Sequence, residues 1–357
     1  MANAVLKTTV DEALAPGAAF DTLIDARSPA EFADDHLPGA VNWPTLDDAE
    51  RARVGTLYVQ DSPLAARKVG AALAARNIAR HLDAHLADKQ REWRPLVYCW
   101  RGGQRSGSLA LVLAQIGFRT AQLQGGYKAF RARVRADLDV LPSRLSYRVL
   151  CGRTGSGKTR LLQALREAGA QVLDLEGLAR HRGSVLGGMP GQPQPSQKRF
   201  DTLVWHALAG FDATRPVFVE SESAKIGSLR VPEALLAAMH GQGQPLRVAT
   251  ADAARIALLL DDYRDSTTDP EPLCQLLGGL VELRGRERVA HWQALARAGR
   301  WPELVGLLMA EHYDPLYERS MKRSYPGLAQ APRIELARGD DAELAAAAQA
   351  LMAQPLP

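Results

Sequence analysis

A glycine-rich segment of eight residues, Gly152–Thr159, constrains the fold of this chain more than any other feature of its sequence. It follows an apolar run, Tyr147–Cys151, and precedes leucines at helical spacing, so we expect a strand, a loop and a helix in that order. In such a loop the glycines let the backbone wrap a di- or triphosphate, Lys158 neutralises the outer oxygens and the Thr159 hydroxyl can bind Mg²⁺. The predicted phosphate-binding residues are therefore Gly152, Thr154, Gly155, Ser156, Gly157, Lys158 and Thr159.

An acidic side chain that organises Mg²⁺ is expected at the end of a strand next to this loop. Glu220 follows the apolar run 217–219, and Asp174 follows the apolar pair 172–173. Together with Thr159, these two carboxylates are the candidate metal ligands. The alternative for each is an ion pair at a strand end with no metal bound.

Apolar runs alternate with helical patterns along most of the 357 residues, which predicts an α/β protein with parallel sheets flanked by helices. Leu-Pro-Ser at 141–143 interrupts this alternating pattern and is predicted to be a linker between two domains. We therefore predict a first domain at residues 1–140, a phosphate-loop domain at 141–281 and a helical C-terminal region at 282–357 packed on that second domain. A segment rich in glycine and proline, residues 187–195, is predicted to be a functional or a mobile loop.

Composition excludes several classes of protein. Hydrophobic residues make up 46% of the chain and charged residues 24%, which rules out wholesale disorder. Three cysteines are too few for a disulfide scaffold and fit a reducing compartment. No apolar run is long enough for a signal peptide or a membrane span, so we expect a cytoplasmic protein with no membrane partner. The net charge of +4 is compatible with a nucleic-acid partner but does not require one.

A second chemical signal is the loop that begins at Cys99, directly after the apolar run 96–98. The loop reads Cys-Trp-Arg-Gly-Gly-Gln-Arg, and we expect a helix to begin near Ser106. Backbone N–H groups at a helix start can form an anion cradle, and with Arg101 and Arg105 they favour a thiolate nucleophile. We predict Cys99, Arg105 and Arg101 as catalytic residues. The alternative is a buried, inert cysteine.

Two further segments resemble the rhodanese family. The run 23–40 contains Asp-Ala-Arg-Ser-Pro and His-Leu-Pro-Gly-Ala, and the run 123–127 contains a glycine pair that closes such a domain. Five residues separate Cys99 from Arg105, one more than in most small sulfurtransferases of that family. The same spacing occurs in rhodanese-fold phosphatases, so spacing alone leaves chalcogen transfer and phosphatase chemistry both open.

The combination of both loops resembles the tRNA 2-selenouridine synthase family. The resemblance extends to the segments Asp174–Gly177, His181–Ser184, Glu220–Ser223, Ile226–Gly227 and His312–Tyr317. It implies that wobble 2-thiouridine in tRNA is first S-geranylated with geranyl diphosphate at the phosphate loop. Selenophosphate then supplies selenium, which Cys99 carries as a selenylsulfide. The resemblance further implies Mg²⁺, no organic cofactor, and selenophosphate synthetase as a partner.

RNA must reach both loops. Lys128, Arg131, Lys198 and Arg199 are the predicted RNA contacts, and the alternative for the first two is a solvated basic helix face. Two other functions compete with the synthase. One is a nucleotide-dependent kinase or NTPase with a regulatory, anion-binding rhodanese domain, and the other is a phosphatase that uses Cys99 and Arg105.

Overall fold

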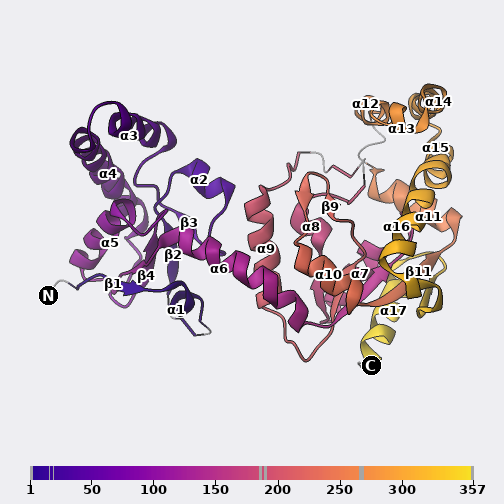
Figure 1. The fold of residues 1–357 in the computed structure, drawn as a ribbon, viewed down its shortest axis with the longest axis horizontal. Helices are drawn as coiled ribbons and strands as arrows, with labels where there is room; N and C mark the ends of the chain where they lie inside the picture. The colour runs from indigo at the N-terminus through magenta and orange to yellow at the C-terminus, as the bar shows by residue number, and fades with distance from the viewer. Residues whose placement is uncertain are drawn as a thin grey trace. The chain divides into compact units, whose positions relative to one another are not determined.

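The computed structural model describes residues 3–15, 17–18, 20–184, 187–188, 191–264 and 269–354. The chain forms two compact units, which differ from a simple division of the sequence into consecutive domains. Unit 1 contains residues 1–137 and 195–206, and unit 2 contains residues 138–194 and 207–357. Each unit has its own parallel sheet with helices (Figure 1), which confirms the predicted α/β class. In the described part of the chain, no helix has both the length and the apolar character that a membrane crossing needs.

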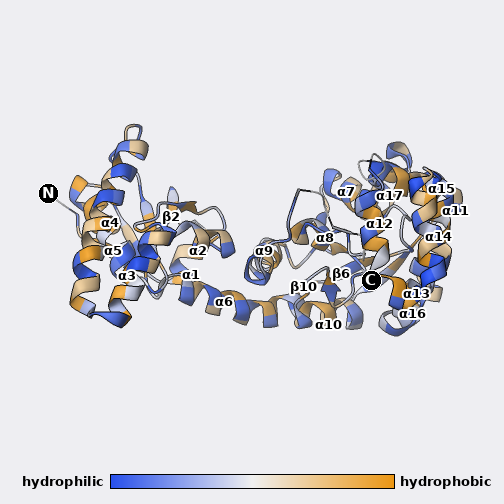
Figure 2. Ribbon diagram, turned by 90° about the horizontal axis from the view of Figure 1, so that it is seen from above, coloured by the Kyte–Doolittle hydropathy of each residue, from blue (hydrophilic) through white to orange (hydrophobic). Residues whose placement is uncertain are grey.

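Unit 1 is built on a five-stranded parallel sheet with the order β1-β5-β4-β2-β3. Its core contains Ile24, Trp43, Val97 and Leu113, all buried between the sheet and its helices. The strands are β1 (Leu6–Thr8), β2 (Thr22–Asp25), β3 (Val41–Asn42), β4 (Pro95–Tyr98) and β5 (Ala121–Leu123). The helices are α1 (Val10–Leu14), α2 (Pro29–Asp34), α3 (Asp48–Gln60), α4 (Pro63–His85), α5 (Gln104–Ile116) and α6 (Gly126–Val140). In Figure 2, α4 and α6 carry hydrophilic and hydrophobic residues along their whole length, as expected for helices with one packed face.

Unit 2 has a second five-stranded parallel sheet, with the order β12-β11-β6-β8-β7. The strands are β6 (Tyr147–Cys151), β7 (Gln171–Leu173), β8 (Val217–Glu220), β11 (Gln244–Thr250) and β12 (Arg333–Leu336), with a separate antiparallel pair, β9 (Lys225–Ile226) and β10 (Leu229–Arg230). Each strand predicted from an apolar run in this half of the chain is present. The expected linker at 141–143 is a short 3₁₀ helix, Leu141–Arg144.

Helices of unit 2 pack around this sheet and extend to the C-terminus. They are α7 (Lys158–Glu167), α8 (Leu175–Ala179), α10 (Glu233–Gly241), α11 (Asp252–Asp262), α12 (Glu271–Gly278), α13 (Val281–Arg284), α14 (Arg286–Arg297), α15 (Trp301–Leu308), α16 (Asp314–Ser324) and α17 (Asp341–Ala353). A π-helical turn, Met309–Tyr313, joins α15 to α16, and a 3₁₀ helix, Pro326–Gln330, follows α16. The C-terminal region is not helical throughout, because β12 lies within it and forms the sheet edge beside β11.

A short segment from the middle of the phosphate-loop half belongs to unit 1. Helix α9 (Gln197–Ala209) places its first ten residues there, where Phe130 and Trp205 pack edge to face with ring centroids 5.4 Å apart. The segment is held by the buried carboxylate of Asp35, which accepts hydrogen bonds from Thr202 and from Tyr127 at 2.9 Å each. The segment begins at Pro195, the last residue of the Gly/Pro-rich stretch 187–195, of which residues 189 and 190 lie outside the described residues.

Candidate active sites

The phosphate loop of unit 2 follows β6 and ends where α7 begins. Gly157 is the residue before the helix and has φ of +83°, a left-handed conformation that favours glycine. The Nζ atom of Lys158 donates to the carbonyl of Gly152 over 2.7 Å, so the lysine folds back over its own loop. The leucines predicted at helical spacing, 161, 162 and 165, are buried and fix α7 against the sheet. The loop thus presents its backbone and Lys158 to the space in front of it.

Three glutamates converge beside this loop. Carboxylate oxygens of Glu176, Glu220 and Glu222 all lie within 4.8 Å of one another. Glu220 ends β8 and is 4% exposed; burial raises its pKa, while the nearby Lys158 and Thr159 act in the opposite direction. Its Oε1 atom is buried without a hydrogen-bond partner in the part of the chain that the structure describes. The predicted pair of Thr159 and Glu220 is therefore brought together, with two additional carboxylates.

The three carboxylates of this cluster repel one another when they are ionised. Burial, together with repulsion from Glu220 and Glu222, raises the pKa of Glu176 to about 9. Burial and the charge of Glu220 likewise raise the pKa of Glu222 to about 8, although Lys158 works in the opposite direction. A divalent cation prefers carboxylate and hydroxyl oxygens and would remove this repulsion. The donor set of the cluster, with its unpartnered Glu220 oxygen, therefore fits Mg²⁺.

Asp174, the other predicted metal ligand, has a different role in the structure. Its Oδ1 atom accepts the backbone N–H of Gly177 over 2.8 Å and so caps the start of α8. Its second oxygen lies 3.3 Å from Arg166. Asp174 lines the same cavity as the three glutamates but is not one of their group. Sequence reasoning missed Glu176 and Glu222, although both lie in segments on which the family resemblance rests.

One cavity of about 660 Å³ contains the phosphate loop and the carboxylates. It also has an apolar and aromatic wall, made by Leu259, Tyr263, Tyr313, Leu316 and Met321. A buried arginine, Arg255, joins this wall to the loop, because it donates to the Thr154 carbonyl and to Asp314 at the start of α16. The cavity can therefore hold a molecule with a charged diphosphate end and a hydrocarbon end.

The cysteine loop of unit 1 follows β4, and its helix α5 begins at Gln104, two residues earlier than expected. Cys99 is 4% exposed, and its Sγ accepts a hydrogen bond from the Ser106 hydroxyl at 3.1 Å. Gln122 donates to that hydroxyl over 2.7 Å and to the carbonyls of Gly102 and Gly103. Neither Ser106 nor Gln122 was predicted as part of the site, because only the fold brings β5 under the loop.

The glycine pair 125–126 closes directly onto the cysteine loop. A Cβ atom on Gly126 would lie 2.2 Å from the carbonyl oxygen of Cys99, closer than any side chain can approach. The next residue, Tyr127, donates its backbone N–H to that same carbonyl over 2.8 Å. The close approach explains why glycine is needed here. It also fixes the backbone of the loop that carries Cys99.

The two predicted arginines of this loop differ in their surroundings. Arg105 forms an ion pair with Glu31, with Nη1 and Oε2 2.6 Å apart, and does not contact Cys99. Burial would raise the pKa of Glu31, but its ion pairs with Arg105 and Arg51 hold that pKa below its ordinary value. Arg101 is exposed and forms no ion pair with the described residues. Both guanidinium groups belong to the loop region. Arg105 is paired with a carboxylate, whereas Arg101 has no such pair among the described residues.

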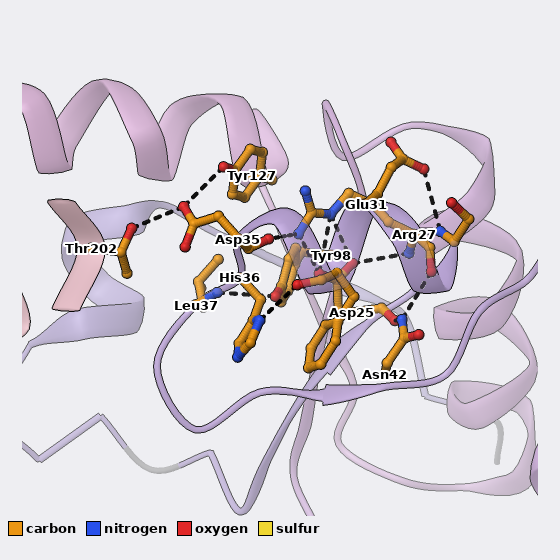
Figure 3. A network of polar contacts seen from close by, with 12 residues as sticks. Asp25, Arg27, Glu31, Asp35, His36, Leu37, Asn42, Tyr98, Tyr127 and Thr202 are labelled. Atoms are coloured by element: carbon orange, nitrogen blue, oxygen red, sulfur yellow. Dashed lines mark hydrogen bonds and ion pairs between the residues drawn. The ribbon is translucent and has the colours of Figure 1, made fainter. Parts of the chain in front are cut away.

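A network of polar contacts holds the Asp-Ala-Arg-Ser-Pro segment in place (Figure 3). Arg27 and Asp25 form a fully buried ion pair at 2.6 Å, and Arg27 also donates to the carbonyl of Asp35. The Arg27 guanidinium lies over the ring of Tyr127, 3.8 Å from its centroid. Tyr98, the residue before Cys99, accepts the backbone N–H of Leu37. This network positions the strand end that carries Cys99, and its members are structural.

Three of the four predicted RNA contacts make contacts within unit 1. Arg131 is 9% exposed and donates to Thr202, Asp201 and the Lys198 carbonyl. Lys198 pairs with Asp34 at 2.6 Å, and Arg199 donates to the carbonyl of His36. These side chains hold α9 on unit 1. Lys128 is exposed.

The fold and the two loops define an enzyme that joins a rhodanese domain to a phosphate-loop domain. A model of the Rhodanese-like domain matches residues 8–133, and a model described as the tRNA 2-selenouridine synthase AAA domain matches residues 145–274. The chain is 32% identical over 325 residues to the tRNA 2-selenouridine synthase of Shewanella halifaxensis, covering 83% of this chain and 87% of that one. The chain belongs to the tRNA 2-selenouridine synthase family.

Other relatives agree with this assignment. The tRNA 2-selenouridine synthase of Chromohalobacter salexigens is 35% identical over 328 residues, which cover 85% of this chain and 88% of that one. That of Nitrosomonas europaea is 36% identical over 258 residues, which cover 71% of this chain and 66% of that one. These matches confirm the family predicted from the sequence. They also make the protein an enzyme, a selenotransferase that acts on tRNA.

Proposed function

We propose that the chain converts 2-thiouridine at the wobble position of tRNA to 2-selenouridine in two steps, one at each loop. Unit 2 first transfers a geranyl group from geranyl diphosphate to the sulfur of the base. Unit 1 then replaces the S-geranyl group with selenium from selenophosphate, for which selenophosphate synthetase is the proposed partner. The observation that supports this proposal is the cavity of unit 2, which combines a phosphate loop, three converging glutamates and an apolar wall.

In the first step the sulfur of the base attacks C1 of geranyl diphosphate. A C–S bond forms, the C1–O bond breaks, pyrophosphate leaves with the electron pair, and the base gives up its N3 proton. Lys158 and the loop amides stabilise the charge that develops on the leaving diphosphate. Thr159, Glu220, Glu176 and Glu222 would hold Mg²⁺, which supplies further neutralisation of that charge when bound. The apolar wall with Tyr263, Leu316 and Met321 takes the hydrocarbon chain.

In the second step a C–Se bond forms at C2 of the base, the C2–S bond breaks and geranylthiolate leaves. Cys99 carries the selenium as a selenylsulfide. Because selenophosphate holds selenium at the selenide level, forming the S–Se bond removes two electrons, which a small disulfide accepts to become two thiols, while water takes up the phosphoryl group as phosphate. After transfer to the base the two thiols cleave the S–Se bond and re-form the disulfide, so an assay supplies this disulfide–thiol pair. Arg101 and Arg105 attract the selenophosphate anion to the loop, and Ser106 supports the thiolate by its hydrogen bond to Sγ. Lys128, exposed on the helix behind the loop, is the remaining proposed RNA contact.

The experiment that tests this division of labour feeds two substrates to each variant. Lys158→Ala and Thr159→Ala should lower geranylation of 2-thiouridine tRNA by about a hundredfold or more, since transition-state charge loses its partner. Both should still convert tRNA that is already S-geranylated. Cys99→Ala should do the reverse and accumulate S-geranyl tRNA. The readout is mass spectrometry of digested tRNA.

Two results would contradict the proposal. If Lys158→Ala failed equally on both substrates, the phosphate loop would also serve selenation. If the wild-type chain hydrolysed ATP or GTP rapidly without tRNA and did not geranylate it, the NTPase alternative would explain the phosphate loop better.

A further inference from the structure

A second cavity of about 530 Å³ adjoins the phosphate loop and is not used by the steps above. It is formed by the end of β11, by α16 and by the 3₁₀ helix that follows α16. Four residues line both this cavity and the larger one, namely Gly152, Ser156, Tyr317 and Met321. A ligand in the second cavity would therefore lie beside whatever the phosphate loop binds. We call it the β11 cavity.

The walls of the β11 cavity are mostly apolar and aromatic. Val248, Met321 and Tyr325 are each more than 90% buried, and Tyr317 and Leu328 also line the cavity, as do Arg153 and Glu318, which form an ion pair with each other. Flat rings and a methionine give a surface on which a planar molecule can stack. A hydrocarbon chain would also be accepted by such walls, so apolar character alone does not identify the ligand.

Unpartnered hydroxyl groups discriminate between these ligands. The Ser156 and Tyr325 side chains are 2% and 3% exposed, and the structure gives their hydroxyl oxygens no hydrogen-bond partner within the described ranges. Cys151 and Tyr317 line the β11 cavity together with Tyr325. A hydrocarbon would leave both hydroxyls unsatisfied, whereas a heterocycle with donors and acceptors at its edge would satisfy them.

The rim of the β11 cavity carries unpaired positive charge. Arg247 and Lys322 are exposed, and neither side chain forms an ion pair or hydrogen bond with the residues that the structure describes. A free nucleotide with its phosphates in the phosphate loop would leave both cations unused. A polynucleotide has phosphates on either side of each base, so it would use them.

We propose that the β11 cavity binds the target base of the tRNA, flipped out of the anticodon loop, with flanking phosphates on Arg247 and Lys322. Flipping a base in a single-stranded loop costs little, and enzymes that modify a base need it outside the stack. The shared residues would place the base next to the diphosphate. This inference rests on the proposed geranylation at the phosphate loop, because it supplies the acceptor for that step.

The test uses the full chain and an anticodon stem-loop RNA with 2-aminopurine at the wobble position. This fluorophore brightens when it leaves the base stack, and the readout needs no turnover. We expect brightening with the wild type and its loss with Leu328→Trp, which fills the β11 cavity and does not line the larger one. Arg247→Ala combined with Lys322→Ala should weaken RNA binding about tenfold and lower its salt dependence by about two phosphate contacts.

Arg319→Ala is the matched control, because Arg319 is an exposed cation on the same helix, α16, that does not line the β11 cavity. It should bind RNA as the wild type does. Pyrophosphate binding, measured by calorimetry, should persist in Leu328→Trp and so shows that this variant is folded.

Three outcomes would overturn the inference: no brightening in the wild type, equal brightening in Leu328→Trp, or equal loss of affinity in Arg319→Ala and in the Arg247/Lys322 double variant. Loss of ATP binding in Leu328→Trp with unchanged RNA binding would also overturn it, because the cavity would then serve a free nucleotide. A normal fluorescence response in a chain that does not geranylate tRNA would count against the proposed first step and support the base pocket.

Discussion

The hydroxyl of Ser106 donates a hydrogen bond to the sulfur of Cys99 over 3.1 Å. Gln122 holds that hydroxyl in place from β5 with a bond of 2.7 Å. Such a donor stabilises the thiolate, which is the reactive form of cysteine. We predict that Ser106→Ala slows alkylation of Cys99 at pH 7 several-fold and lowers selenation of S-geranyl tRNA to a similar extent. Iodoacetamide kinetics followed by mass spectrometry of Cys99 peptides would measure the first effect.

The control for this prediction is Ser108→Ala. Ser108 lies on the same helix, and its hydroxyl donates to the Arg105 carbonyl instead of to sulfur. It should leave Cys99 alkylation unchanged. If Ser106→Ala reacted at the wild-type rate, the hydrogen bond would be structural and the thiolate would owe its stability to the backbone amides of the loop.

The three cysteines should differ sharply in reactivity. Cys151 is fully buried, and burial raises its pKa to about 12. Cys274 is 1% exposed, and burial raises its pKa as well. We therefore expect a thiol reagent at pH 8 to modify Cys99 in the folded chain and to leave the other two intact. Rapid labelling of Cys151 under native conditions would contradict the packing of β6 behind the phosphate loop.

Cys151→Ser and Cys274→Ser should also retain most of the selenation activity, since neither thiol lies in an anion cradle. Cys99→Ser should abolish it while tRNA binding persists. A Cys99→Ser variant that made 2-selenouridine at a near-normal rate would refute the assignment of Cys99.

Sequence patterns predicted both loops, because a strand, a glycine-rich loop and a helix form one continuous stretch of chain. The Lys158 loop and the Cys99 loop are each complete within about a dozen residues, so no tertiary information was needed. The same holds for the strand ending at Glu220, whose apolar run is uninterrupted. The features that could be predicted from the sequence are therefore those formed by one continuous segment of the chain.

The parts that sequence reasoning missed depend on contacts between distant segments. Glu176 and Glu222 join Glu220 only because β7 and β8 are neighbours in the sheet and end at the same edge. Gln122 reaches the cysteine loop only because β5 pairs with β4. Nothing in the local pattern around Thr202 predicts that it bonds to Asp35, 167 positions earlier.

The bond between Thr202 and Asp35 yields a stability prediction. Asp35 is fully buried, accepts from Tyr127 and Thr202, and lies 3.7 Å from Arg131. Asp35→Ala leaves the Tyr127 and Thr202 hydroxyls without their buried acceptor, although Arg131 keeps its ion pair with Asp201, and should destabilise the attachment of α9 by about 3 kcal/mol. Thr202→Val removes two hydrogen bonds, one to Asp35 and one from Arg131, and should cost about 1–2 kcal/mol.

Hydrogen exchange of the α9 amides would measure both effects. We expect faster exchange in α9 for each variant, with the larger increase for Asp35→Ala. Thr214→Val is a suitable control, because Thr214 bonds to Asp212 in an exposed turn of unit 2. Unchanged protection of α9 in Asp35→Ala would show that apolar contacts such as Phe130 with Trp205 hold the helix by themselves.

The carboxylate of Glu343 gives a prediction for the pH dependence of unit 2. It accepts three backbone N–H groups, from Ala337, Arg338 and Gly339, at 2.5–2.9 Å. These bonds, the one from Ala337 above all, hold the pKa of Glu343 below its ordinary value of 4.5. The turn that they close leads into α17, whose buried Leu344 and Leu351 pack in the same core as α7.

The sign of the effect follows from the lowered pKa. A carboxyl whose pKa is lower in the folded state contributes stability above its unfolded pKa, and this contribution is lost as the pH falls through the folded pKa. Glu343→Gln removes the charge and should therefore destabilise unit 2 at pH 7 by about 1 kcal/mol, a value kept small by solvent screening. The deficit should shrink as the pH falls below 4.5, because the wild-type carboxyl is then progressively protonated. Thermal melting of both chains at pH 7, 5 and 3 would measure it.

Glu335→Gln is the matched control, because Glu335 forms an exposed ion pair with Arg333 at 3.0 Å and accepts no such set of amides. It should show little deficit at any pH. A Glu343→Gln deficit of equal size at pH 3 and pH 7 would show that the side chain acts through its shape and not through its charge.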